Sequence, residues 1–252
     1  MNTLIGVNNL TVVEQPAYGN HAQFLYRLGK MHPNDNFALC NPRRMSIDNM
    51  RNFCAKAALE GEFDYIMFID DDVLIPVLAF DMLVRHLVTK KCDIVSGVTL
   101  IRGYPYNPMI FDVGEDKSTK GFVKNYAERA DTNGLCFCDA VGFSCCLISV
   151  ALLRKMTPPY FVTGPGFTED VYFCVRAKRQ FPETLIAADV NCTTAHILGP
   201  DIISPENRDI RMAYDEAMNP GIKEHLDPDE DRIKRELDLY AKCGFEVIAQ
   251  ET

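Results

Sequence analysis

The sequence predicts an α/β fold in which helices flank a mostly parallel central sheet. A continuous apolar run of strand length occurs at Tyr65–Ile69, and such a run suits a strand that is buried on both faces of a parallel sheet. The next strand is expected at Asp93–Thr99. A segment with apolar residues at helical spacing precedes each of these strands, at Ser46–Glu60 and at Pro76–Lys91. This alternation of helix and strand is typical of a parallel sheet with helices on both faces.

The N-terminal part of the chain begins with a β-branched, apolar segment that predicts the first strand. We expect a strand, a turn, a helix and a strand at Leu4–Val13, Gln15–Gly19, Asn20–Lys30 and Phe37–Cys40. In the helix that follows, Ser46 stands where an N-cap belongs and Gly61 where a C-cap glycine belongs. In the next helix, Pro76 occupies a first-turn position, which suits proline.

The alternation loosens after residue 100. The segment Gly103–Asn133 is rich in Gly, Pro, Tyr, Lys and Asp, and it predicts loops with two short strands. We then expect a strand running into a helix, a second helix and a further strand at Val141–Met156, Thr168–Phe181 and Thr184–Val190.

The end of the chain predicts a polar, helical tail. Ser204-Pro205 and Asp227-Pro228 each place a capping residue before a proline, the pattern of a helix start. We therefore expect one domain over residues 1–199 and a helical C-terminal extension over residues 200–252 that packs on it.

The composition is that of an ordinary globular protein. The chain has 252 residues, of which 47% are hydrophobic and 24% charged, enough for one α/β domain with a small appendage. The net charge of −9 argues against a broad basic surface for nucleic acid. The first residues lack the features of a secretory signal and no apolar run is long enough to span a bilayer, so we expect a cytoplasmic protein without a membrane span.

The ten cysteines include no C-x-x-C pair. Several lie inside apolar stretches, so we expect reduced and mostly buried thiols. Cys136 and Cys138 with a distant histidine make a zinc site an alternative, although this set lacks the second ligand pair of a tetrahedral site.

Three consecutive carboxylates, Asp70, Asp71 and Asp72, follow directly on the predicted strand Tyr65–Ile69. In open parallel sheets, ligands bind beyond the carboxyl ends of the strands. Adjacent like charges repel one another, so a cation is the natural compensation, and oxygen ligands suit Mg²⁺ or Mn²⁺. The alternative is that Asp72 caps the next helix and the others are solvated, but capping explains one aspartate rather than three.

Further candidates lie in the second half of the chain. Glu169 and Asp170 begin a predicted helix after the loop Gly164–Phe167, whose glycines allow close approach of a ligand. The alternative is that these acids only complement the helix dipole. His196 follows the predicted strand that ends near Val190. A single histidine is more often structural, but beside a carboxylate metal site it becomes a candidate nitrogen ligand.

Two more positions have a structural and a functional interpretation. Asp48 and Arg51 are three residues apart on one helix face, so they form either a surface ion pair or part of a binding site. Gly142 precedes an apolar segment and permits either a close approach to a ligand or a β-bulge. No glycine-rich dinucleotide fingerprint follows a strand and no P-loop motif occurs, so neither enzyme class is supported.

The order of these motifs resembles that of GT-A fold glycosyltransferases, above all family-2-like enzymes, which include small stand-alone members common in bacteriophages. The residues that carry the resemblance are Arg51-Asn52, Phe68–Asp72, Asp139–Gly142, Thr168–Cys174 and His196. The likeness covers about residues 4–198. It implies a Rossmann-like GT-A fold and a metal-dependent hexosyl- or pentosyltransferase that moves a sugar from a nucleotide-sugar donor to an acceptor hydroxyl.

The resemblance also implies a role for each candidate residue. Asp170 corresponds to the general base of an inverting reaction, with Glu169 beside it. The expected ligands of Mn²⁺ or Mg²⁺ are Asp72, Asp70 and His196. The residues expected around the donor are Pro16, Tyr18, Asp48, Arg51, Asp70, Asp71 and Gly142.

Substrate identity is less closely defined. UDP is the commonest nucleotide in the family, but the loop Glu14–Tyr18 departs from the family pattern at the expected base-binding position. The acceptor can be a glycan, a protein or a modified nucleic-acid base. Two alternatives stay open: a haloacid-dehalogenase-like phosphatase with Asp70 as nucleophile and Asp72 as acid, and a non-catalytic module that binds a nucleotide sugar or a glycan.

Overall fold

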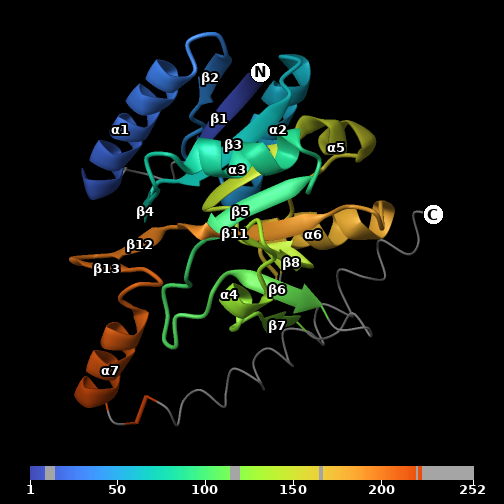
Figure 1. Ribbon diagram of the computed structural model, residues 1–252. Helices are drawn as coiled ribbons and strands as arrows, with labels where there is room; N and C mark the ends of the chain where they lie inside the picture. Colours follow the sequence, from blue (N-terminus) through green and yellow to red (C-terminus); the bar gives the residue numbers. More distant parts are fainter. Residues whose placement is uncertain (9–14, 114–119, 165–166, 220, 223–252) are drawn as a thin grey trace.

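The computed structural model describes residues 1–8, 15–113, 120–164, 167–219 and 221–222 (Figure 1). Its centre is a seven-stranded sheet with the order β2-β1-β3-β10-β5-β11-β8. The strands are β1 (Asn2–Asn8), β2 (Asn36–Cys40), β3 (Tyr65–Asp70), β5 (Ile94–Val98), β8 (Leu135–Cys138), β10 (Cys145–Ser149) and β11 (Ile186–Thr193). All except β8 and β10 run in one direction, so the predicted mostly parallel sheet is confirmed.

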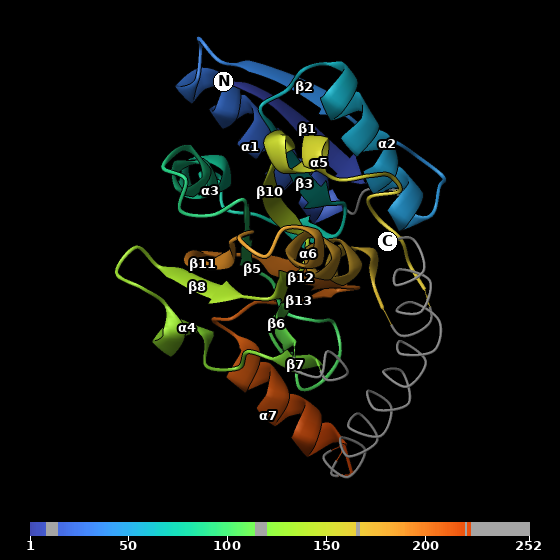
Figure 2. The same cartoon turned by 90° about the vertical axis from the view of Figure 1, so that its right-hand side faces the viewer.

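Helices cover both faces of this sheet (Figure 2). The described helices are α1 (Gln15–Met31), α2 (Ile47–Glu60), α3 (Ala79–Val88), α4 (Tyr126–Arg129), α5 (Val150–Lys155), α6 (Glu169–Gln180) and α7 (Arg208–Met218), of which α7 lies away from the sheet (Figure 2). Along β3, Ile66 and Phe68 point into one core with α2, α5 and α6, while Met67 and Ile69 point into the other with α1 and α3. The period of two along a strand thus divides a continuous apolar run between two buried layers.

Two smaller sheets complete the described fold. The first joins β4 (Val73–Leu74), β12 (Ala195–Leu198) and β13 (Asp201–Ile203), and it pairs His196 with Val73. The second joins β6 (Ile110–Val113), β7 (Lys120–Phe122) and β9 (Ala140–Val141). β6 and β7 are the two short strands expected in the loop-rich segment.

Some element boundaries differ from the sequence prediction. The turn predicted at Gln15–Gly19 is wrong, because α1 already begins at Gln15. Proline is tolerated in a first helical turn, and the buried face of α1 extends back to Ala17. The helix predicted from Pro76 begins three residues later at Ala79, after a turn closed by the Ala79 N–H on the Pro76 oxygen. The predicted strand Leu4–Val13 is described only as far as Asn8.

The tail is described through its first helix. α7 begins at Arg208, somewhat after the predicted start at Ser204, and Asn207 occupies its N-cap position. α7 contacts the segment that follows β5, where the Tyr104 hydroxyl donates a hydrogen bond to Glu216 over 2.6 Å. The second helix predicted for the tail, from Asp227 onward, lies outside the described residues, and the boundary at residue 199 stays a prediction.

No helix among the described residues is long and apolar enough to cross a membrane.

Candidate active site

Arg51 joins acids from two distant parts of the chain. From α2, its Nε donates a hydrogen bond to Glu169 Oε1 over 2.8 Å, and its Nη2 donates to Asp70 Oδ1 over 3.1 Å. Its Nη1 donates to the backbone oxygen of Phe143 over 3.4 Å. Asp70 ends β3 and Glu169 begins α6, so one guanidinium connects a strand end to a helix start. We call Arg51, Asp70, Glu169 and Asp170 the Arg51 centre.

The guanidinium of Arg51 is deeply buried. Its side chain is 2% exposed and lies over the rings of Phe68 and Phe143, 5.0 and 5.6 Å from their centroids. Burial by itself lowers the pKa of Arg51, but three nearby carboxylates outweigh burial and raise that pKa above its usual value. A charge this deep in the protein requires such partners, so the acids and the arginine fix each other in place.

The two acids at the start of α6 have different surroundings. Burial is the first cause that raises the pKa of Glu169, and Arg51 opposes it. Asp170 is also buried, and its Oδ1 accepts the Val171 N–H over 2.7 Å within its own helix. Glu169 therefore holds Arg51, whereas the Asp170 carboxylate makes no hydrogen bond to Arg51 among the contacts of the described residues. The preceding loop is described except for residues 165–166.

Asp72 and His196 face each other beside this centre. The ladder between β4 and β12 brings the Ile197 N–H to the Asp72 backbone oxygen over 2.9 Å. His196 Nε2 then lies 4.0 Å from Asp72 Oδ1, and His196 Nδ1 lies 2.5 Å from the Leu100 oxygen. Burial lowers the pKa of His196. A neutral ring that donates from Nδ1 presents the Nε2 lone pair toward Asp72, the arrangement expected of a metal-ligating histidine.

These residues fit a divalent cation that is shared with a substrate. Among the residues that the structure describes, no group of three His, Cys, Asp or Glu side chains is close enough to hold a metal alone. Mg²⁺ commonly binds through one or two protein carboxylates, with water and substrate phosphates completing its coordination. The Asp72–His196 pair matches that requirement, with Asp70 two residues away. The same finding gives no support to the alternative zinc site at Cys136 and Cys138.

Two residues near these acids were not identified from the sequence. Arg102, in the segment after β5, contacts Asp72 Oδ2 with its Nη2. The Asn8 amide, at the end of β1, donates a hydrogen bond to Asp70 Oδ1 over 3.4 Å. Both follow or end a parallel strand, so the strand-end rule that singled out the three aspartates would have found them.

Other predicted donor residues are placed less directly. Arg51 pairs with Asp70 and Glu169. Its described contacts do not include the ion pair with Asp48 that the sequence suggested as one interpretation. Asp48 Oδ1 is buried and has no hydrogen-bond partner among the described residues. Pro16 and Tyr18 are exposed on the first turn of α1 rather than in a loop. Residues 9–14, which precede them, lie outside the described residues.

Asp71 and Gly142 complete the predicted set. Asp71 is half-buried in the turn after β3. At Gly142, a Cβ atom would lie 2.6 Å from Cε of Met109, so a neighbouring side chain makes the close approach that the glycine permits. The nearby Asp139 pairs with Lys178 over 2.6 Å.

The described cysteines are free and buried. Burial raises the pKa values of Cys136 and Cys138, with nearby charges contributing. This agrees with the expectation of reduced and mostly buried thiols.

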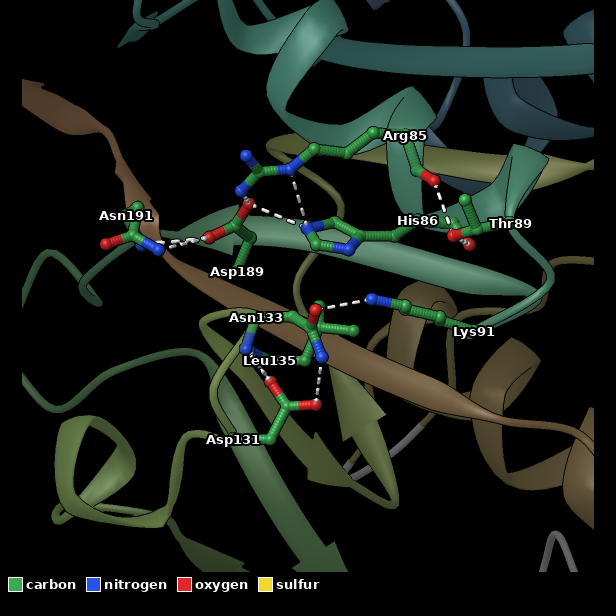
Figure 3. Close-up of polar contacts among 9 residues, drawn as sticks. All are labelled: Arg85, His86, Thr89, Lys91, Asp131, Asn133, Leu135, Asp189 and Asn191. Atoms are coloured by element: carbon green, nitrogen blue, oxygen red, sulfur yellow. Dashed lines mark hydrogen bonds and ion pairs between the residues drawn. The ribbon is translucent and has the colours of Figure 1, made fainter.

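A second polar region surrounds a cavity of about 750 Å³ between α3, β11 and the loop before β8 (Figure 3). We call it the Asp189 pocket; it is lined in part by Arg85, His86, Lys91, Asp131, Asn133 and Asn191. Asp189, fully buried, accepts hydrogen bonds from Arg85 and Asn191 and contacts His86 Nε2 over 3.0 Å. Asp131 accepts from Asn133 and Leu135 in the same way. None of the Arg51 centre lines this cavity.

Comparisons with known proteins found solved structures with a similar fold. No protein-family model matches the chain, and no curated protein matches it. Among solved structures, A197 from STIV is similar with a TM-score of 0.58 and 19% identity, over 82% of this chain and 91% of that chain. TarS 1-349 of S. aureus, in complex with UDP-GlcNAc, is similar with a TM-score of 0.45 and 12% identity, over 75% of this chain and 56% of that chain.

The similarity to A197 concerns the fold. It extends over most of both chains and agrees with the mostly parallel sheet and its two helical layers. The α/β, Rossmann-like GT-A architecture that the sequence predicted is thereby confirmed.

Proposed function

We propose that this protein is a metal-dependent glycosyltransferase that takes a hexosyl or pentosyl unit from a nucleotide-sugar donor, with UDP as the first candidate nucleotide. The observation that carries the proposal is the Arg51 centre. It holds an acid from the end of β3 and two acids from the start of α6 within one network. Acids from a strand end and a helix start, beside a histidine–aspartate pair, provide for metal binding and proton transfer together.

The donor side of the proposed site is built on the end of β3. Asp72 and His196 would hold Mn²⁺ or Mg²⁺, which supplies stabilisation of the charge that develops on the leaving diphosphate. Asp70, fixed by Arg51 over 3.1 Å, is directed to the ribose or the sugar. Asp48 Oδ1 is buried and has no hydrogen-bond partner within the described part of the chain, the condition expected of an acceptor for a ribose hydroxyl. The remaining proposed donor contacts are Pro16, Tyr18, Asp71 and Gly142.

Asp170 is proposed as the general base. The acceptor hydroxyl loses its proton as its oxygen bonds to the sugar carbon, and the bond to the diphosphate breaks. Glu169 is occupied by its hydrogen bond to Arg51 over 2.8 Å, so Asp170 is the acid of α6 that this network leaves for the acceptor. A base on the opposite face from the leaving group gives inversion at the anomeric carbon. The acceptor hydroxyl can belong to a glycan, a protein or a modified nucleic-acid base.

A thermal-shift screen of nucleoside diphosphates and nucleotide sugars with Mn²⁺ tests the proposal. A ligand at 100 times its Kd stabilises the folded state by about 2.7 kcal/mol, which for a domain of this size raises Tm by roughly 5–10 °C. We expect the shift to require the metal and to be mostly lost in Asp72→Asn. An undiminished shift in excess EDTA would overturn the metal-bridged site.

Assays of the product released by the same protein distinguish the proposed enzyme from the phosphatase and from the binding module. A phosphatase would release phosphate from a generic phosphoester and become covalently phosphorylated at Asp70, the nucleophile in that alternative. A binding module would retain the metal-dependent shift but release no nucleoside diphosphate from any nucleotide sugar. The proposed enzyme gives release of nucleoside diphosphate, and NMR coupling constants of the product give an anomer opposite to that of the donor.

A further inference from the structure

Arg102 is a cation in direct contact with the Asp72–His196 pair. Its Nη2 contacts Asp72 Oδ2, while Asp72 Oδ1 faces His196 Nε2 over 4.0 Å. The Asp72 side chain is 15% exposed and that of Arg102 is 59% exposed. One partly buried carboxylate therefore has an arginine on one oxygen and a candidate metal ligand beside the other.

The backbone around Arg102 is well anchored. The Ile101 N–H donates to the Asn107 oxygen over 2.9 Å, and the Tyr106 N–H donates to the Gly103 oxygen over 2.7 Å. From α7, Arg208 Nε donates to the Tyr106 oxygen over 2.9 Å. The long side chain of Arg102 is by contrast more than half exposed, so it can leave Asp72 while the backbone stays in place.

Arg102 and a divalent cation require the same carboxylate. A cation bound by Asp72 and His196 would stand next to the guanidinium, and the two positive charges would repel each other. A diphosphate bound to that cation would turn this repulsion into a net attraction for Arg102, because the diphosphate brings negative charge and oxygen acceptors. The planar guanidinium of arginine matches phosphate oxygens in a two-point hydrogen bond.

We propose that Arg102 forms an ion pair with Asp72 while no donor is bound. When the metal-bound donor enters, Arg102 leaves Asp72 and binds the diphosphate instead. The proposal rests on the function proposed above and adds a regulation of the same site. Arg102 opposes binding of the metal alone and favours binding of the metal with a nucleoside diphosphate. Because coupling between two ligands is reciprocal, the diphosphate also tightens binding of the metal, and this coupling runs through Arg102.

Titration calorimetry on the full chain tests the proposal, with Mn²⁺ alone and with UDP, GDP, ADP and CDP in saturating Mn²⁺. The variant is Arg102→Gln. We expect Mn²⁺ alone to bind about fivefold or more tightly than in the wild type. We expect the best nucleoside diphosphate to bind about 10- to 100-fold more weakly, the loss that follows from removing a charged hydrogen-bond pair. Arg27→Gln, which removes an exposed arginine of α1, serves as the matched control and should change neither Kd.

The two titrations distinguish a failure of the proposed function from a failure of the role proposed for Arg102. If the wild type binds no nucleoside diphosphate with Mn²⁺, the proposed function fails and this proposal fails with it. If it binds one, and Arg102→Gln leaves both Kd values unchanged, only the role of Arg102 is overturned. Weaker binding of Mn²⁺ alone in Arg102→Gln also overturns it, because a residue that merely supports Asp72 would give that result.

Discussion

The Arg51 centre and the Asp189 pocket both pair a buried charge with an opposite one, but they do so with opposite polarity. In the Asp189 pocket the carboxylate is 0% exposed and its partner Arg85 is 52% exposed. In the Arg51 centre the arginine is 2% exposed and the Asp70 carboxylate is 21% exposed. The first region turns an arginine toward solvent and the second turns a carboxylate toward solvent.

This difference shows why the Asp189 pocket is the weaker functional candidate. The acids of the Asp189 pocket are engaged by side chains and backbone groups around them (Figure 3), so they are already compensated. At the Arg51 centre Asp70 keeps partial exposure. Beside this centre Asp72 faces His196 and is paired with Arg102, whose side chain is 59% exposed and can leave. Partly exposed acids around a buried cation are suited to recruit a further cation from solution.

The largest expected effect concerns Asp170. Asp170→Asn should lower turnover by about 10²–10⁴-fold, the usual contribution of a general base, while donor binding with Mn²⁺ stays unchanged. Release of nucleoside diphosphate from the donor under steady-state conditions measures the rate, and the thermal shift measures binding. Asp131→Asn, which changes an exposed acid of the other region, is the matched control and should keep turnover within about twofold of the wild type. Near-normal turnover of Asp170→Asn would remove Asp170 from this role.

The second prediction compares how much Arg51 and Arg85 contribute to the stability of the folded protein. Arg51→Met leaves two acids without their buried cation, so we expect the free energy of unfolding to fall by about 3–5 kcal/mol. Nucleoside diphosphate binding should also be lost, because Asp70 is no longer fixed. Arg85→Gln should lower the free energy of unfolding by a smaller amount, about 1–2 kcal/mol, because Asp189 keeps its contacts with His86 and Asn191. Urea denaturation measures both, and equal losses in the two variants would contradict the contrast drawn between the regions.

The smallest effect concerns His21, which supports the strand that follows Asp72. His21 Nε2 bonds to the Val73 oxygen over 2.8 Å, and burial lowers the pKa of His21 below its usual value of 6.5. The unfolded chain therefore takes up a proton at a higher pH than the folded protein. The stability contributed by His21 is present above about pH 6.5 and is lost as the pH falls below it, by up to about 1.4 kcal/mol per pH unit.

Urea denaturation at pH 7.5 and pH 5.5 checks the effect of His21. His21→Gln keeps a side-chain donor but cannot titrate, so the variant should lose less stability on acidification than the wild type. An identical pH dependence in the two proteins would show that His21 makes no such contribution.

The strands and helices could be predicted where apolar spacing was long and regular. The apolar run Tyr65–Ile69 forms β3 with one further residue, and the helical spacing of Ser46–Glu60 gives α2. The start of α1 was missed because Gln15–Gly19 contains residues typical of turns, whereas the burial of Ala17 on the helix face decided the outcome. Packing of an amphipathic helix face therefore determines where a helix begins more strongly than local composition does.

The candidate site could be predicted as a set of residues but not as a network. The strand-end rule selected the three aspartates, and the predicted helix start selected Glu169 and Asp170. Their connection through Arg51 depends on a contact between residues 118 apart in the chain, which no local pattern contains. Arg102 follows the end of β5, so the strand-end rule could have selected it, but its contact with Asp72 across the site could not be predicted from a local pattern.

The most direct test of the account is the position of a bound metal. Crystals of the protein soaked with Mn²⁺ and UDP, measured by anomalous diffraction at the manganese edge, would locate the ion. The account predicts manganese coordinated by the Asp72 carboxylate and His196 Nε2, with the UDP phosphates completing its shell, and no such ion in His196→Ala at the same concentration. Manganese bound instead beside Asp131 or Asp189, or held by UDP without contact to Asp72 and His196, would contradict it.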